Sequence, residues 1–334
     1  MSEESPIPSE QSSTDQEWPG VKQSELLDES ERLWHDLNVV SVSVIRHSQW
    51  LRNPNWGARF GSLSPEGVEM ARESAKEWAS RLPETAEVSL YESPSFVPAE
   101  QKTATGETKP ITPMRASMTA SLYEREVFGN MEPGKKDEFG MAQAARRTRD
   151  PRLSDFMGSK RGGDTEDFTG MRIISEVYGG VNENFWRDFY TLVGADSRVE
   201  EAIKQSGGTD YLGLAENMTE FITDSVTDLQ EKSITVDRMC KEVALAVCHG
   251  ETIRAFTHFL SEYLRSQGDL EAANLIHERG ETEPEYTSGF DAHFDPRADK
   301  LIVIFKELGE VEVSLYDYKN YLKVLRRYKE SQQS

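Results

Sequence analysis

Cysteine is scarce in this chain, which has only Cys240 and Cys248 among its 334 residues. Two cysteines are too few for a disulfide scaffold, and their spacing is not that of a zinc knuckle. Long apolar runs are also missing: no stretch approaches the roughly 18 to 20 residues of a membrane span. The first residues carry acids where a secretory signal has basic and then apolar residues. We therefore expect a cytoplasmic protein that does not enter a membrane.

Positive charge is in short supply as well. The chain has 38 lysines and arginines against 59 aspartates and glutamates, so its formal net charge is −21. Proteins that bind nucleic acids or polyphosphates need a positive field, so the composition argues against both classes, and any phosphate site must be local. Residues 1–34 are rich in acids, serine and proline, which predicts a flexible acidic tail. Residues 35–330 are expected to form a single domain.

Short β-rich runs alternate with amphipathic helical patterns over most of the chain. Strands are expected near residues 39–45, 87–92 and 243–247, and helices after Ser64-Pro65, from about Met114, and directly after Val247. A hairpin around Leu308-Gly309 and a last helix over residues 318–328 are expected to follow. This pattern predicts an α/β fold with three α/β/α layers, a mostly parallel central sheet and helices on both faces. Polar insertions are expected near residues 95–111, 133–165 and 265–298.

Two histidines follow two of the expected strands. His47 comes after Arg46, and His249 is followed by Gly250 and the start of a helix. Open α/β sheets bind ligands beyond the carboxyl ends of their parallel strands, and a helix N-terminus attracts anions. The two histidines therefore predict a small phosphate pocket, although either one could instead make only local hydrogen bonds at the end of its strand.

A series of motifs surrounds these histidines. They are Arg46-His47-Ser48, Leu63-Ser64-Pro65-Glu66-Gly67, Ser93-Pro94, Arg115-Ala116-Ser117-Met118-Thr119-Ala120 and Val247-Cys248-His249-Gly250-Glu251-Thr252-Ile253-Arg254. In this order, from about residue 39 to 259, the chain resembles the histidine phosphatase superfamily, in the branch of the phosphoglycerate mutases and related phosphatases. Ser48 stands where that family has glycine. The segment from Glu124 to Met131 is similar to the family's Glu-x-x-Phe-Gly region.

The resemblance implies a role for each matching residue. His47 would attack phosphorus and become transiently phosphorylated. The phosphate ligands implied are Arg46, Asn53, Arg115 and His249. Glu126 would be the acid that protonates the leaving oxygen, with Glu124 as the alternative, so the catalytic set implied is His47, Glu126 and His249.

This scheme requires no cofactor and no metal, and the other histidines show no metal-ligand spacing. The sequence thus predicts a metal-independent phosphomonoester hydrolase that acts on a small phosphorylated substrate; it makes no prediction of oligomeric state. Two alternatives stay open: a catalytically weak or inactive phosphate-binding or scaffold protein of the same fold, and a phosphoglycerate-type mutase. Hydrolysis is preferred over mutase activity, because a mutase must hold its phosphorylated intermediate while excluding water.

Overall fold

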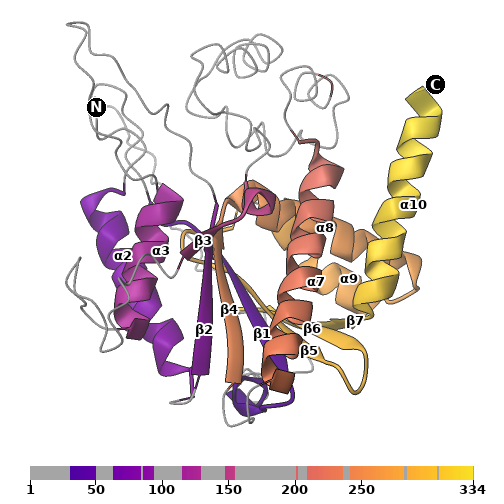
Figure 1. Ribbon diagram of the computed structural model, residues 1–334. Coiled ribbons are helices and arrows are strands. Elements are labelled where there is room, and N and C mark those ends of the chain that lie inside the picture. The colour runs from indigo at the N-terminus through magenta and orange to yellow at the C-terminus, as the bar shows by residue number, and fades with distance from the viewer. Residues whose placement is uncertain are drawn as a thin grey trace, which may run out of the picture.

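A seven-stranded sheet forms the centre of the molecule (Figure 1). The computed structural model describes residues 31–49, 63–83, 86–93, 115–128, 147–154, 201, 209–235, 241–281, 284–306 and 308–333. The strands are β1 (Val40–Arg46), β2 (Ala86–Glu92), β3 (Arg147–Arg149), β4 (Lys241–Cys248), β5 (Gly289–Asp295), β6 (Lys300–Phe305) and β7 (Gly309–Val313). Their order across the sheet is β3-β2-β4-β1-β5-β6-β7.

The sheet has a parallel and an antiparallel half. Strands β3, β2, β4 and β1 pair in parallel, and β5, β6 and β7 then continue the sheet with antiparallel pairings. Every residue of β1 and β4 is buried. β4 contains a continuous apolar run, as strands covered on both faces do, whereas β1 could be recognised by its β-branched valines, which alternate with the buried Ser41 and Ser43.

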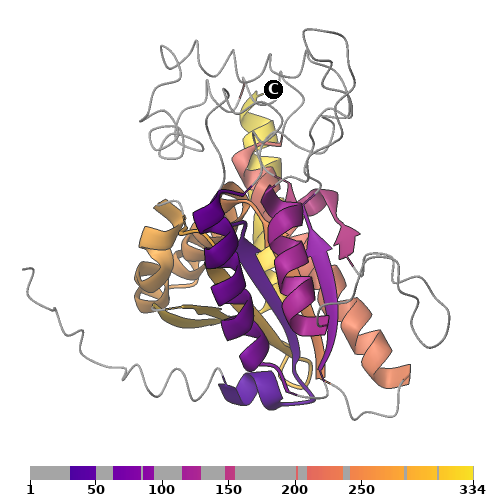
Figure 2. The ribbon, with the colours of Figure 1, turned by 90° about the vertical axis from the view of Figure 1, so that its left-hand side faces the viewer.

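Helices cover both faces, so the predicted three-layer α/β/α architecture is confirmed. The helices α2 (Pro65–Ser80) and α3 (Arg115–Phe128) lie on one face, where their apolar residues share a core with β2 and β4. On the other face lie α7 (Tyr211–Thr235), α8 (Gly250–Ser266), α9 (Leu270–Glu281) and α10 (Leu315–Gln333). Figure 2 shows α2 and α3 side by side in front of the sheet. None of the described helices is long and apolar enough to cross a membrane.

Local signals located the first of these helices well. Pro65 occupies its first turn, where the missing N–H costs nothing, and the Ser64 side chain accepts a hydrogen bond from the Gly67 N–H at 2.9 Å. The predicted hairpin is also present, as β6 and β7. The last helix begins at Leu315, a few residues earlier than expected.

The expected insertion at residues 265–298 requires a correction. It contains α9 and also β5, which pairs with β1 from Val40 opposite Phe294 to Ile45 opposite Gly289. Aspartates alternate with apolar residues in this strand, and this made it resemble a polar loop. Residues 95–111 lie outside the described residues, whereas the expected insertion at 133–165 includes β3 and the short 3-10 helix η2 (Pro151–Leu153).

The first described residues lie within the predicted acidic tail. Residues 31–35 form a helical turn in which Trp34 is fully buried. The Trp34 ring packs edge-on against His293 and Trp78, with centroid distances of 5.2 and 6.1 Å. Residues 31–34 are therefore not part of a flexible tail, and the prediction missed this because a single tryptophan carries little weight in the composition of a polar stretch.

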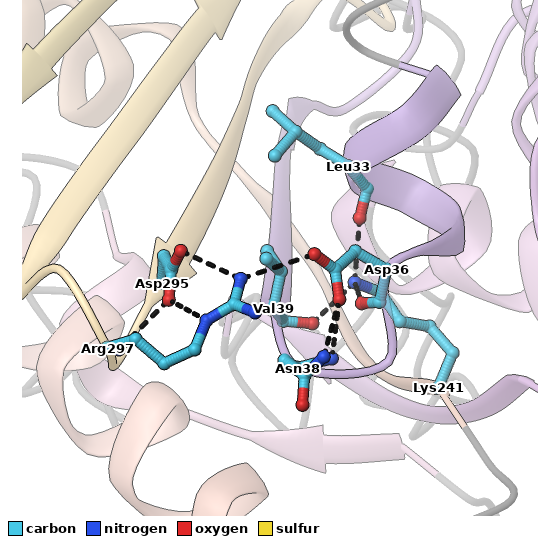
Figure 3. Close-up of polar contacts among 7 residues, drawn as sticks. All are labelled: Leu33, Asp36, Asn38, Val39, Lys241, Asp295 and Arg297. Carbon is cyan, nitrogen blue, oxygen red and sulfur yellow. Dashed lines mark hydrogen bonds and ion pairs between the residues drawn. The ribbon is translucent and has the colours of Figure 1, made fainter.

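A buried lysine holds this N-terminal turn against the sheet (Figure 3). The Lys241 Nζ donates to the backbone carbonyls of Leu33 at 2.8 Å and Asp36 at 2.9 Å, and also to that of Val39. Arg297 joins the same region from the other side, since its guanidinium binds both Asp295 and Asp36. The first residue of β4 thus anchors the segment that leads into β1.

Candidate active site

His47 and His249 lie next to each other at the carboxyl edge of the parallel strands. Arg46 is level with Cys248 in the β1–β4 pairing, and the His47 N–H continues this ladder by donating to the Cys248 carbonyl at 3.0 Å. His249 follows β4 directly and is the N-cap residue of α8. The two rings are 5.2 Å apart between centroids. Parallel pairing of β1 with β4 therefore brings together two residues that are about 200 positions apart in the sequence.

The hydrogen bonds of His47 define its tautomer. Its Nδ1 lies 2.8 Å from the Ser48 carbonyl oxygen, which can only accept, so Nδ1 carries the proton. Its Nε2 accepts a hydrogen bond from Nε of Arg115 at 2.8 Å. Burial lowers the pKa of this imidazole well below 6.5, and the charge of Arg115 lowers it further. His47 is thus a neutral ring with its lone pair on Nε2.

Arg115 spans the two histidines. It is the first residue of α3, and its Nη2 lies 3.4 Å from Nδ1 of His249. On the other side of that ring, Ser93 Oγ lies 3.0 Å from Nε2. Ser93 itself follows β2 and is fixed there by its N–H, which donates to the Val247 carbonyl at 2.9 Å. The ends of three neighbouring parallel strands and the starts of two helices, α3 and α8, therefore meet at this site.

Arg46 lies beside His47 and is held by the segment before β5. Its guanidinium carbon is 4.1 Å from the centroid of the Tyr286 ring, and its Nη1 donates to the Pro284 carbonyl. The Tyr286 ring is also 6.1 Å from the ring of His47. Neither Tyr286 nor the role of Ser93 could be predicted from the sequence, because neither residue has a local signal for a contact that only the tertiary structure creates.

The predicted acids are not brought to the histidine pair. Glu126 is exposed near the far end of α3, and eleven residues of helix separate it from Arg115 by roughly 16 Å along the axis. Glu124 lies two residues closer and pairs with Nε of Arg147 at 2.9 Å. These positions do not support the prediction that Glu126 or Glu124 is the acid, because both lie further along α3 than Arg115, which contacts the histidines. Asn53 lies outside the described residues.

The arrangement of charges suits a single phosphoryl group. Two guanidinium groups, Arg46 and Arg115, lie next to a neutral histidine, and the positive end of the α8 dipole begins at His249. These groups form a local positive region in a chain with a net charge of −21. Among the described residues, no group of three histidine, cysteine or carboxylate side chains could hold a metal ion.

Comparisons with known structures found distant similarities. No protein-family model and no curated protein matches this chain. A phosphoglycerate mutase from Bacillus anthracis str. Sterne is similar at 15% identity and a TM-score of 0.42, over 86% of this chain and 97% of that chain. A mycobacterial glucosyl-3-phosphoglycerate phosphatase is similar at 13% identity and a TM-score of 0.39, over 82% and 97%. At such values, these similarities identify neither the activity nor the substrate of this chain.

Proposed function

We propose that this chain is a phosphomonoester hydrolase of the histidine phosphatase type, with His47 as its transiently phosphorylated nucleophile. The observation that supports this most directly is the hydrogen bonding of His47, whose Nδ1 lies against the Ser48 carbonyl and whose Nε2 lies against Nε of Arg115, because these two contacts place the proton on Nδ1 and the lone pair on Nε2. A nucleophilic histidine needs such a neutral ring, and the lowered pKa of His47 keeps it neutral at neutral pH.

The reaction would run in two steps at the same nitrogen. In the first, Nε2 forms a bond to phosphorus while the bond from phosphorus to the ester oxygen breaks, and that oxygen leaves with the electron pair as an alkoxide or phenolate, which takes a proton from water. In the second, water attacks phosphorus, the P–N bond breaks, and inorganic phosphate and the neutral imidazole are restored. Arg115, Arg46 and His249 would stabilise the charge on the phosphoryl oxygens, which is the main contribution of a protein to phosphoryl transfer.

Arg115 must turn for this chemistry to proceed. Its Nε donates to the same Nε2 lone pair that would attack phosphorus, at 2.8 Å. A bound phosphoryl group would draw the guanidinium from the nitrogen to the phosphoryl oxygens, because charge-assisted bonds to phosphate are stronger than a bond to a neutral ring. The same contact favours a second candidate function, a phosphate-binding protein without turnover, if Arg115 keeps this lone pair engaged.

The experiment that separates the two is hydrolysis of an aryl phosphate by the full chain in the presence of a chelator. An aryl phosphate is suitable because its phenolate leaves without a proton from the protein. The phosphatase predicts steady release of the phenol and, after rapid denaturing at alkaline pH, an acid-labile phosphoryl group on the peptide that contains His47. Binding of inorganic phosphate without phenol release would support the second candidate and overturn the first.

The activity is expected to persist at a lower pH than an ordinary histidine would allow. His47 must be neutral to attack, and its pKa lies well below 6.5, so its protonation should not reduce kcat/KM as the pH falls from 8 to 6.5. Arg115 is one cause of the lowered pKa. Arg115→Gln should therefore move the acid limb of the kcat/KM profile to higher pH, besides lowering the rate.

The wild type and the variants are compared with the same substrate, so that the titration of the substrate affects every kcat/KM profile equally. Arg72→Gln provides the control, since Arg72 pairs with Glu69 on the exposed side of α2. An acid limb at the same pH in all three proteins would contradict an effect of Arg115 on the ionisation of His47.

A further inference from the structure

Thr119 connects the segment that carries His47 to the helical turn that carries Arg115. Its Oγ1 accepts a hydrogen bond from the Ser48 N–H at 3.0 Å and donates one to the Arg115 carbonyl at 2.8 Å. Thr119 is fully buried, so water cannot readily replace either bond. One hydroxyl thus joins the chain just after the nucleophile to the first residue of α3.

Ser48 is fixed on its other side by α2. Its own hydroxyl donates to the Gly67 carbonyl at 2.7 Å, and its side chain is fully buried. The backbone of this segment is pressed against the same helix, since a Cβ atom on Gly67 would lie 2.0 Å from the Gln49 carbonyl oxygen. The Ser48 side chain is therefore directed to α2, and its backbone faces α3. Ser48, which stands where the histidine phosphatases have glycine, is therefore hydrogen-bonded to both α2 and α3.

Thr119 therefore links the segment that carries His47 to the first turn of α3, which carries Arg115. The segment of His47 is held by β4 and α2, whereas Arg115 lies at the start of α3, where a helix has fewest internal hydrogen bonds. We propose that Thr119 is a positioning residue, whose hydroxyl sets the place of the Arg115 guanidinium relative to the His47 imidazole. The kinetic consequence of this inference rests on the proposed phosphatase function, but its structural consequence does not.

The chain contains a matched control for the loss of this hydroxyl. Thr257 on α8 is also fully buried, and its Oγ1 donates to the carbonyl four residues earlier, that of Ile253, at 2.9 Å. Thr119→Val and Thr257→Val therefore both remove a buried hydroxyl and its bond to the preceding turn. Only Thr119→Val also removes the acceptor of the Ser48 N–H.

In the kinetic test, Thr119→Val should lower kcat for an aryl phosphate about ten- to a hundredfold, with a smaller change in KM. Displacement of a positioned group by about 1 Å can cost this much in rate. Thr119→Ser keeps the hydroxyl and should restore most of the activity, and Thr257→Val should stay within about threefold of the wild type. Equal kinetic effects of Thr119→Val and Thr257→Val would overturn the inference.

A second measurement decides the same question without turnover. Nitrogen-15 NMR of the histidine rings in the full chain reports the tautomer and the hydrogen bond at each ring nitrogen, and the His47 signals are assigned by their loss in His47→Gln. Thr119→Val should shift the Nε2 signal of His47, because Arg115 is no longer held against it, whereas Thr257→Val should not. Unchanged His47 signals in Thr119→Val would overturn the inference even if the wild type were active.

The two measurements keep the proposals separate. A wild type that hydrolyses no phosphomonoester would contradict the proposed function, and the NMR comparison would still decide whether Thr119 positions Arg115. Conversely, the wild type could be active while Thr119→Val has the same kinetic constants and the same His47 signals as the wild type. That result would leave the phosphatase function intact and refute the positioning role.

Discussion

Replacement of His47 by glutamine is expected to abolish aryl phosphate hydrolysis, with a fall in kcat of about 10⁴-fold or more. Loss of a covalent nucleophile typically has an effect of this size, because the remaining groups bind the substrate but have no atom to accept the phosphoryl group. Glutamine retains an amide oxygen that can accept the hydrogen bond of Arg115, so the change removes the nucleophilic nitrogen with little disturbance of its neighbours. Initial rates with a chelator present provide the measurement.

The control for this variant is His35→Gln, since His35 is an exposed histidine in the N-terminal turn. It should hydrolyse the substrate at the wild-type rate. Calorimetry with inorganic phosphate adds a second comparison: His47→Gln should still bind phosphate, because Arg46, Arg115 and His249 remain. Equal turnover in His47→Gln and the wild type would show that another group is the nucleophile.

Replacement of Lys241 by methionine is expected to lower the free energy of unfolding by about 2–4 kcal/mol. Lys241 Nζ is the donor to the carbonyls of Leu33, Asp36 and Val39, and a buried carbonyl that loses its partner costs about 1–3 kcal/mol. Methionine fills a similar volume without a charge, which recovers part of this loss, because burial disfavours the ammonium and lowers the pKa of Lys241 to about 7. Urea unfolding curves with unchanged slopes would measure the difference.

Lys306→Met is the matched control for charge and size. Lys306 is 65% exposed and pairs with Glu77 on the surface, and such pairs contribute about 0–1 kcal/mol. Hydrogen exchange should further show faster exchange across residues 31–39 in Lys241→Met than in Lys306→Met. Equal stability of the two variants would mean that the three carbonyls find other donors and that Lys241 does not hold the N-terminal turn.

The strands and helices that carry the site were predicted from local patterns. The apolar run of β4 and the valine-rich sequence of β1 are signals of strands that are buried in the sheet. The helix α2 begins with the Ser64-Pro65 pair, whose capping chemistry is complete within four residues. Such signals depend only on neighbours along the chain. They also sufficed to predict that His47 and His249 follow two strands of one parallel sheet.

Patterns failed where position depends on a distant partner. The aspartates of β5 made this segment look like a polar loop in the sequence. Its pairing with β1 is what places it in the sheet. The resemblance suggested Glu126 as the acid, but Glu126 lies eleven positions after Arg115 on α3, roughly 16 Å along the helix. The roles of Ser93 and Tyr286 at the site follow from contacts with His249 and Arg46 that have no counterpart in local sequence.

By itself, the sequence determined the α/β architecture and the position of the two candidate histidines after strands, because periodicity, capping and residue chemistry are local properties, whereas Arg115 was implied by the resemblance to the histidine phosphatases. Only the tertiary structure decided the tautomer of His47, the hydrogen bond from Arg115 to its Nε2, the tie of Ser48 to α2 and the role of Lys241. Each of these depends on distances of a few ångströms between segments far apart in the chain, and sheet pairing and helix packing set those distances.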